Sequence, residues 1–249
     1  MDNLIIPKDY HSELNLHDTQ IAIKTVKDFF QGLLALRLNL SRVSAPLFVD
    51  PLSGLNDNLN GVERPVTFDI KEQNGRTAEV VQSLAKWKRY ALKKYGFSYG
   101  EGLYTDMNAI RRDEITDNIH SIFVDQWDWE RTVTAEQRNL DFLKEIVTKI
   151  YGVVRRMERE VYEIYPHITP ILPETIRFIQ SEDLLKMYPS LSPRERETEA
   201  ARKYGAIFVI GIGGKLSDGK KHDERGKDTQ EIQIHFFCPP PRSEPVTAR

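Results

Sequence analysis

The chain has 249 residues, and its 35 lysines and arginines nearly balance its 37 aspartates and glutamates, for a formal net charge of −2. This balance argues against a nucleic-acid-binding surface spread over the whole molecule. With 40% hydrophobic and 29% charged residues, the composition is typical of a soluble globular protein with a sizeable core.

Neither a disulfide nor a membrane segment is expected. The single cysteine, Cys238, cannot form an internal disulfide, and the N-terminus lacks the basic and apolar regions of a signal peptide. No apolar stretch approaches the roughly 20 residues that a membrane span needs. We therefore expect a cytoplasmic protein with no membrane segment.

The first elements in chain order are a helix and a strand. Apolar residues at steps of three and four between positions 23 and 34 predict one buried helix face, with Asp18 and Thr19 as candidate caps. Apolar and polar residues then alternate over positions 38–43, which predicts a strand.

A hairpin and a short helix are predicted next. The β-type runs 66–70 and 78–81 flank Asn74-Gly75, a dipeptide that favours a tight turn. Helix formers follow at positions 83–92, and the first of these residues is a serine suited to cap the helix.

The segment 121–130 alternates with the period of a β-strand, so its side chains divide between two faces. One face is mostly polar and the other is largely aromatic. The first carries Val124, Gln126, Asp128 and Glu130, and the second carries Phe123, Asp125, Trp127 and Trp129.

Two helices and a buried strand are predicted in the second half. A capping-box pattern at 134–137 precedes apolar residues at helical spacing over 140–164. Another helix begins at Ser192 and ends before Gly205, and residues 206–212 have the continuous apolar character of a buried strand. Because strands and helices mix irregularly, we expect an α+β fold with a mainly antiparallel sheet.

The glycine-rich turn after this strand is not a standard phosphate-binding loop. Lys215 is followed by Leu216, whereas a Walker A loop needs serine or threonine there and a dinucleotide fingerprint needs glycine. The nearby His222 and Asp223 form too weak a pattern for a transition-metal site and indicate a solvated turn.

The polar face of segment 121–130 must find hydrogen-bond donors if it is buried. A bound ammonium group would supply them. Alternatively, Asp128 and Glu130 pair with Arg111 and Arg112 of a neighbouring strand. Both interpretations remain open at this point.

The helix at 83–92 carries a cluster of positive charges, Lys86, Lys88 and Arg89. Such a cluster is commonly a solvated helix face. If it faces the acidic strand instead, opposite charges in one cleft would bind a zwitterion together with a nucleotide.

Five segments in order resemble the signatures of the ammonia-dependent asparagine synthetases, the aspartate–ammonia ligases, over residues 1–225. They are DNLNG at 57–61, SLAKWKR at 83–89, GEGLYT at 100–105, VDQWDWE at 124–130 and GIGGKLSDG at 211–219.

This resemblance implies a catalytic domain like that of class II aminoacyl-tRNA synthetases, an antiparallel sheet flanked by helices, and a homodimer. It also implies that aspartate, ammonia and ATP, with Mg²⁺, give asparagine, AMP and pyrophosphate through a β-aspartyl-adenylate. The reaction requires cationic side chains that neutralise the phosphate charge during attack.

The resemblance also implies roles for individual residues. Arg111 would bind the α-phosphate, Lys88 the β-carboxylate of aspartate, and Asp57 would lie near the incoming ammonia and accept its proton. The remaining expected site residues are Ser83 and Arg89 in the aspartate pocket, Gln126 and Asp128 on its α-ammonium group, and Asp218 on the nucleotide.

The C-terminal segment departs from the family pattern. We predict an incomplete catalytic domain over residues 1–225 and a divergent, proline-rich, disordered tail over 226–249. A truncated domain of this kind would have an impaired nucleotide site, so a second hypothesis is a non-catalytic paralogue that acts by binding or dimerisation. A tRNA synthetase fits less well because the chain has no anticodon-binding module and no broadly basic face.

Overall fold

The computed structural model describes residue 4, residue 6 and the ranges 10–57, 59, 61–118 and 120–223. The chain divides into two compact units, Met1–Asn139 and Leu140–Arg249, which are described separately here. The segment predicted to be a disordered tail, 226–249, lies outside the described residues. In the part of the chain that is described, no helix is long and apolar enough to cross a membrane.

A three-stranded sheet with the order β1-β5-β6 is the centre of unit 1. β1 (Leu40–Arg42) runs parallel to β5 (Gly102–Ile110), and β5 pairs antiparallel with β6 (Phe123–Arg131) over nine residue pairs. Facing residues of an antiparallel pair point to the same side of the sheet. The pairs Met107–Gln126 and Thr105–Asp128 therefore place the polar residues of β6 beside buried residues of β5.

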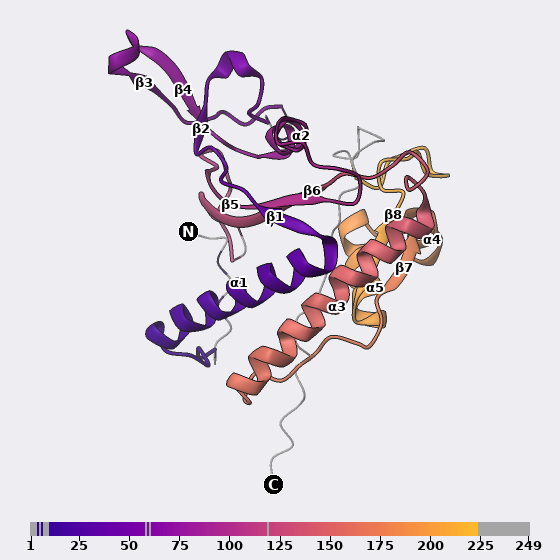
Figure 1. Ribbon diagram of the computed structural model, residues 1–249. Helices are drawn as coiled ribbons and strands as arrows, with labels where there is room; N and C mark the ends of the chain where they lie inside the picture. Colours follow the sequence, from indigo (N-terminus) through magenta and orange to yellow (C-terminus); the bar gives the residue numbers. More distant parts are fainter. Residues whose placement is uncertain are drawn as a thin grey trace. The chain divides into compact units, whose positions relative to one another are not determined.

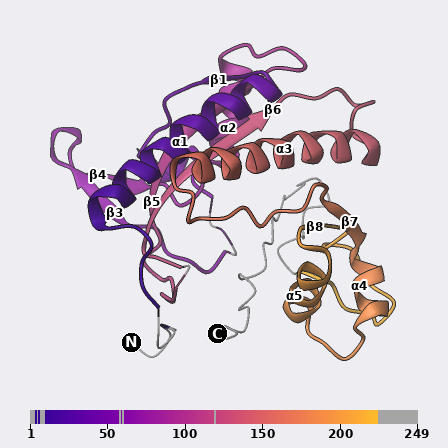
Figure 2. The ribbon, with the colours of Figure 1, turned by 90° about the horizontal axis from the view of Figure 1, so that it is seen from below.

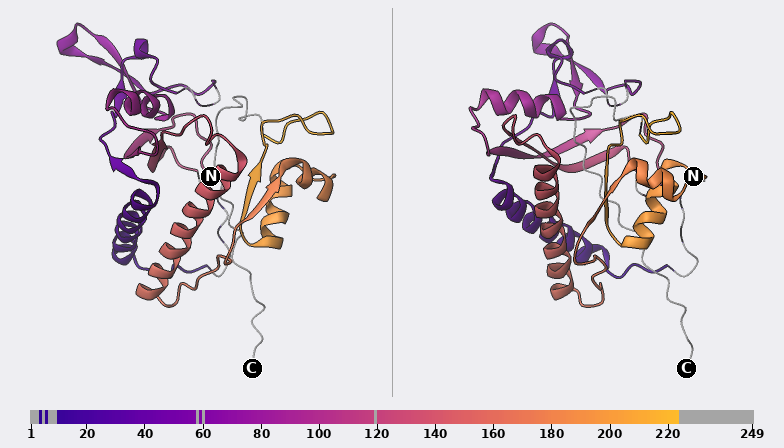
Figure 3. Two further views of the ribbon diagram at one scale, coloured as in Figure 1. Left: turned by 45° about the vertical axis from the view of Figure 1, so that its right-hand side comes forward. Right: turned by 90° about the vertical axis from the view of Figure 1, so that its right-hand side faces the viewer.

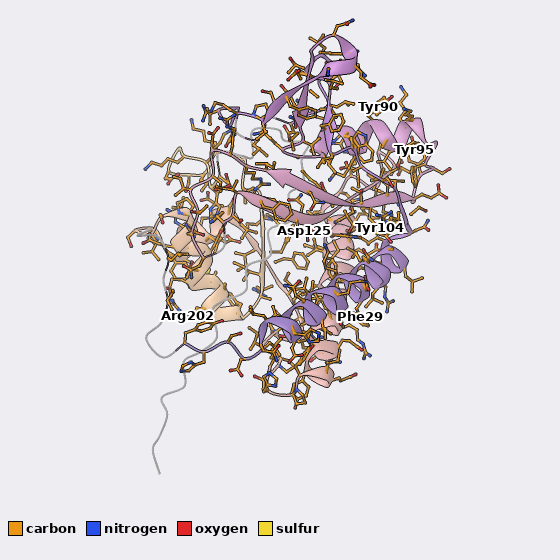
Figure 4. All side chains as sticks on the ribbon, turned by 90° about the vertical axis from the view of Figure 1, so that its left-hand side faces the viewer. Phe29, Tyr90, Tyr95, Tyr104, Asp125 and Arg202 are labelled. Atoms are coloured by element: carbon orange, nitrogen blue, oxygen red, sulfur yellow. The ribbon has the colours of Figure 1, made fainter. Side chains whose placement is uncertain are left out.

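The two faces of this sheet are covered by different helices, α1 (Leu16–Leu38) on one side and α2 (Ala85–Lys94) on the other (Figure 1). Figure 2 shows α1 lying across the sheet. On the α1 side, the rings of Phe30 and Trp127 meet edge to face at 5.8 Å, and Lys27 Nζ lies 2.9 Å from Asp125 Oδ1. Tyr104 and Asp125 point to this side in Figure 4. The aromatic face predicted for segment 121–130 is thus the α1 face.

The α2 side contains the hydrophobic core of unit 1. Trp87 and Ala91 of α2 pack with Leu103, Met107 and Ala109 of β5 in one buried cluster. The polar side chains of β6 share this side with the core, so each charged group there needs a partner within the protein or a ligand.

A second small sheet, with the order β2-β4-β3, extends away from the central sheet (Figure 1). The predicted hairpin is confirmed: β3 (Thr67–Ile70) pairs antiparallel with β4 (Arg76–Val80). The turn contains the 3-10 helix η2 (Lys71–Gln73), followed by Asn74 and Gly75, which both have positive φ. The remaining elements of this region are β2 (Phe48–Val49) and η1 (Pro51–Ser53).

In its described residues, unit 2 combines three helices with a parallel strand pair. The helices are α3 (Leu140–Ile164), α4 (Ser181–Met187) and α5 (Pro193–Tyr204), and β7 (Arg177–Gln180) pairs with β8 (Ile207–Ile210). Figure 3 shows α5 beside the two strands, where its Ala200 and Ala201 are buried with Ile207. The predicted start of α5 at Ser192 is confirmed: Ser192 is the N-cap, and its side chain and that of Glu195 bond reciprocally to the backbone in a capping box.

Several local predictions need correction. The cap of α1 is Asn15, whose side chain accepts from the Asp18 backbone N–H, because the helix begins earlier than the apolar spacing indicates. His222 does not lie in a solvated turn: its ring is buried, and Nε2 lies 2.8 Å from Glu197 Oε1. β7 and α4 have no counterpart among the sequence predictions.

Close packing of the strands requires the glycine at position 102, the second glycine of the GEGLYT signature. A Cβ at this position would lie 2.4 Å from the Glu130 carbonyl oxygen and 2.6 Å from Leu40 Cδ2. A larger residue would therefore push β1 and β6 away from β5. Because β6 carries the predicted site residues, this close approach also fixes the site.

Gly102→Ala is expected to lower the free energy of unfolding by about 1–3 kcal/mol, the usual cost of overpacking. Gly32→Ala is the matched control, since a Cβ there meets nothing within 4 Å and position 32 is inside α1. It should raise stability by roughly 0.5–1 kcal/mol. Urea denaturation measures both, and equal effects would contradict the packing argument.

Candidate active site

Lys88 of α2 and Asp128 of β6 form the central contact of the site. Lys88 Nζ lies 2.5 Å from Asp128 Oδ1 and donates to the Trp129 carbonyl oxygen at 3.1 Å. The Lys88 side chain is 9% exposed and that of Asp128 is 19% exposed. The sequence placed both residues in one pocket, and the structure brings them together.

Glu130 extends this network to a second cation. Its Oε2 lies 3.6 Å from Lys88 Nζ, and its Oε1 lies 3.7 Å from Arg89 Nε. Burial raises the pKa of the Glu130 carboxyl, while Lys88 and Arg89 oppose that shift and Asp128 reinforces it. The site is therefore a chain of alternating charges, with two carboxylates on β6 and two cations on α2.

The ion pairs between α2 and β6 decide between the two partners that the sequence allowed for the β6 carboxylates. Asp128 and Glu130 contact cations of α2, whereas the sequence left open a pairing with Arg111 and Arg112. That alternative is wrong because the polar side chains of β6 face α2, which supplies the two cations.

The loop that carries Asp57 is held against the start of α2 by the buried residue Asn56. Asn56 Oδ1 accepts from the Gln82 backbone N–H at 2.9 Å, and Asn56 Nδ2 donates to the Val80 carbonyl oxygen at 3.3 Å. Lys86 Nζ donates to the Asn56 carbonyl oxygen at 3.3 Å. Asp57 is thereby fixed next to the segment that begins α2.

Ser83 caps the first turn of α2. Its Oγ accepts from the Ala85 backbone N–H at 3.2 Å. Ser83 therefore acts as the expected side-chain cap, although it lies one residue before Leu84, which occupies the N-cap position. The Ser83 hydroxyl thus lies at the N-terminus of α2, and Lys88 is about one turn further along the same helix.

Arg111 and Gln82 line a separate small hollow of about 70 Å³. Gln82 is 1% exposed, and within the described residues neither of its amide atoms has a hydrogen-bond partner. Arg111 Nε is likewise buried without a partner. The other lining residues are Leu59, Glu63, Asp113 and Glu114.

Asp113, which lines this hollow, forms an ion pair with Arg64. The Arg64 backbone N–H donates to Asp113 Oδ2 at 2.8 Å, and the Arg64 guanidinium donates to Asp113 Oδ1 at 2.5 Å. These hydrogen bonds lower the pKa of Asp113 to about 2. They tie the segment around Glu63 to the turn that follows β5.

Two further residues were predicted for the site, Gln126 and Asp218. Gln126 lies on the same face of β6 as Asp128, opposite Met107. Asp218 lies in unit 2, in the turn after β8, where its Oδ1 accepts from the Lys220 backbone N–H at 2.9 Å. Its place beside a nucleotide stays a prediction.

Three residues that line the hollow were not predicted from the sequence: Gln82, Glu63 and Glu114. Gln82 directly precedes the SLAKWKR signature, but a single glutamine carries no signal until its burial is known. No group of three His, Cys, Asp or Glu side chains able to hold a metal ion occurs among the described residues.

Comparison with known proteins agrees with the sequence resemblance. The aspartate–ammonia ligase family model matches residues 17–235. An aspartate–ammonia ligase of Clostridium perfringens is 58% identical over 243 residues, covering 96% of this chain and 72% of the relative. One of Bacteroides fragilis is 56% identical over 228 residues, covering 92% of this chain and 66% of the relative.

Solved structures similar to this chain include two asparaginyl-tRNA synthetases with bound asparaginyl-adenylate. The Entamoeba histolytica enzyme has a TM-score of 0.51 at 14% identity, and the alignment covers 83% of this chain and 49% of that one. The Pyrococcus horikoshii enzyme has a TM-score of 0.53 at 12% identity, with coverages of 77% and 45%. This chain thus spans about half the length of these synthetases, and the likeness shows a class II synthetase fold.

Lys88→Met is expected to lower the free energy of unfolding by about 3 kcal/mol, because it leaves the Asp128 carboxylate buried without its cation. Lys24→Met is the control, since Lys24 pairs with Asp28 on the exposed surface of α1 and should cost less than about 1 kcal/mol. Chemical denaturation at neutral pH measures the difference. Equal losses in the two variants would show that burial does not matter at this contact.

Glu130 should make stability depend on pH. Because its pKa is raised above the ordinary 4.5, its contribution is fully present below that pH and is lost as the pH rises through the raised pKa. Relative to Glu130→Gln, the parent should therefore lose stability as the pH rises from about 4.5 through the raised pKa. Parallel stability curves for the two proteins over this range would refute the shift.

Proposed function

The chain belongs to the aspartate–ammonia ligase family, and we propose that it joins aspartate to ammonia at the expense of ATP, using the α2–β6 charge network to hold aspartate. The observation that carries this proposal is the contact of Lys88 with Asp128, 2.5 Å apart and largely buried. A non-catalytic role has no comparable support, because the named relatives at 56–58% identity are ligases.

Aspartate fits this network because it carries both kinds of charge. Its α-ammonium group would take Asp128 and Gln126 as acceptors, and its β-carboxylate would take Lys88, with Arg89 and Ser83 shaping the pocket. Lys88 and Asp128 would each exchange one opposite partner for another, so neither buried charge would be left unpaired. An uncharged ligand of similar size would separate Lys88 from Asp128 without replacing either partner.

Activation of the β-carboxylate follows from the poor reactivity of a carboxylate. Its oxygen attacks the α-phosphorus of ATP, the bond to pyrophosphate breaks, and β-aspartyl-adenylate forms. Arg111 would neutralise the phosphate charge that develops during attack. Mg²⁺, which is usually held by substrate phosphates and one or two carboxylates, would supply further charge neutralisation on ATP; no three-residue site for it occurs in the described ranges.

Ammonia completes the reaction. Asp57 would accept a proton from ammonium, so that the lone pair of NH₃ becomes available. The nitrogen attacks the acyl carbon, the bond to the phosphate oxygen breaks, and AMP leaves with the electron pair. The nitrogen then loses a second proton and asparagine is formed.

Assembly and location are further parts of the proposal. We infer a cytoplasmic homodimer. The exposed apolar side chains of Phe48 and Phe68, whose rings meet edge to face at 5.1 Å on the β2-β4-β3 sheet, support a surface that a second copy covers.

Pyrophosphate release is expected only when ATP and aspartate are both present, and asparagine only when ammonium is added. Arg111→Ala should reduce aspartate-dependent exchange of pyrophosphate into ATP by about 100-fold. Arg112→Ala, which removes an exposed neighbouring cation, is the control and should stay close to the parent. ATP turnover that does not depend on aspartate would contradict the proposal.

A further inference from the structure

Glu130 contacts both cations of the α2–β6 network but is not among the residues proposed to bind aspartate. Its Oε2 lies 3.6 Å from Lys88 Nζ and its Oε1 lies 3.7 Å from Arg89 Nε, which is beyond ordinary hydrogen-bond length. Asp128, by contrast, lies 2.5 Å from Lys88 Nζ and accepts from the Trp129 backbone N–H at 2.9 Å. Of the two carboxylates, Glu130 is therefore the one that is held charged by the weaker contacts.

The charged groups that act on Glu130 come from α2 and from β6 itself. Burial has the largest effect on the pKa of its carboxyl and raises it, Lys88 and Arg89 lower it, and Asp128 raises it. On the neighbouring strand β5, the residue that faces Glu130 is Leu103, which is apolar and fully buried. The negative charge of Glu130 therefore depends on its two cations of α2.

Aspartate brings more negative charge than this network can pair. It carries two carboxylates and one ammonium group, and it enters a network of two cations and two carboxylates. The complex then has three positive groups and four negative ones, and an unpaired charge in a buried site is costly. The carboxylates of aspartate compete for Lys88 and Arg89, the same cations that keep Glu130 charged, whereas Asp128 gains the α-ammonium group as its partner.

We propose that Glu130 takes up one proton when aspartate binds, and that it thereby distinguishes the substrate aspartate from the product asparagine. The inference rests on the proposed function and adds a specificity-determining residue to the same site. The proton comes from solvent, which reaches the Glu130 side chain because 27% of it is exposed, and it forms an O–H bond at the carboxylate. Asparagine has an amide in place of the β-carboxylate, so it leaves Lys88 to Glu130. Conversion of aspartate to asparagine therefore returns the proton to solvent.

Proton uptake is measured by calorimetric titration of the full chain with aspartate, without ATP, in two buffers that differ in ionisation enthalpy. In the parent, the apparent binding enthalpy should differ between the buffers by the amount expected for up to one proton taken up per aspartate. Glu130→Gln keeps the side-chain size and cannot be charged, so it should bind aspartate with the same enthalpy in both buffers. Asparagine is the matched control ligand, and its binding to the parent should not depend on the buffer.

The same proton makes the affinity for aspartate fall as the pH rises, because the complex binds one proton more than the free protein. Between the pKa of Glu130 in the free protein and its higher pKa in the complex, the Kd of the parent should rise by up to about tenfold per pH unit. Glu130→Gln should keep a nearly constant Kd over this range and bind aspartate more tightly than the parent at its upper end. Glu72→Gln, which removes an exposed carboxylate from the tip of the β3–β4 hairpin, should behave like the parent.

The outcomes separate this inference from the proposed function. Aspartate binding without proton uptake in the parent would overturn the inference and leave the proposed function intact. So would an uptake that persists in Glu130→Gln or is equal for asparagine, because another group would then carry the proton. The asparagine titration uses the parent alone, so it decides the question even if Glu130→Gln does not fold. If the parent does not bind aspartate at all, the proposed function is refuted and the inference with it.

Discussion

The structure of the candidate site depends on one constraint: a lysine ammonium group is buried between a helix and a strand and must have carboxylates beside it. Lys88 projects from the first turns of α2 into the face of the sheet that also contains the core of unit 1. An unpaired ammonium group there would cost several kcal/mol. Asp128 and Glu130 remove that cost, and in doing so they determine which face of β6 points to α2.

The same constraint accounts for the close packing of the central sheet. β6 can present its carboxylates to Lys88 only if its register with β5 is fixed, because a slip of one residue would turn them to the α1 face. Gly102 allows β1 and β6 to approach β5 closely, and Trp127 packs against Phe30 on the opposite face. Residues outside the α2–β6 network therefore fix the positions of the residues within it.

The sequence predicted the period-dependent features and missed those that depend on tertiary contacts. Alternation in segment 121–130 divided its faces correctly, because a strand repeats every two residues. The partner of Asp128 remained open, since nothing in the spacing connects it with Lys88, forty positions earlier in the chain. The burial of the Gln82 amide without a hydrogen-bond partner among the described residues could not be inferred, because it depends on the folded chain. The cap of α1 was misplaced because Asn15 and Asp18 are chemically similar candidates one turn apart.

The α2–β6 network and the hollow beside Arg111 differ in how their buried polar groups are partnered. In the α2–β6 network every charge already has an opposite partner, so a charged ligand can bind there only by exchanging partners. In the hollow, the Gln82 amide and Arg111 Nε have none among the described residues, so a ligand there adds hydrogen bonds without breaking any. The first arrangement would discriminate strongly, because only a ligand with both a positive and a negative group restores the pairs that it breaks. The second arrangement would give a small ligand that bonds to these two groups a net gain of hydrogen bonds on entry.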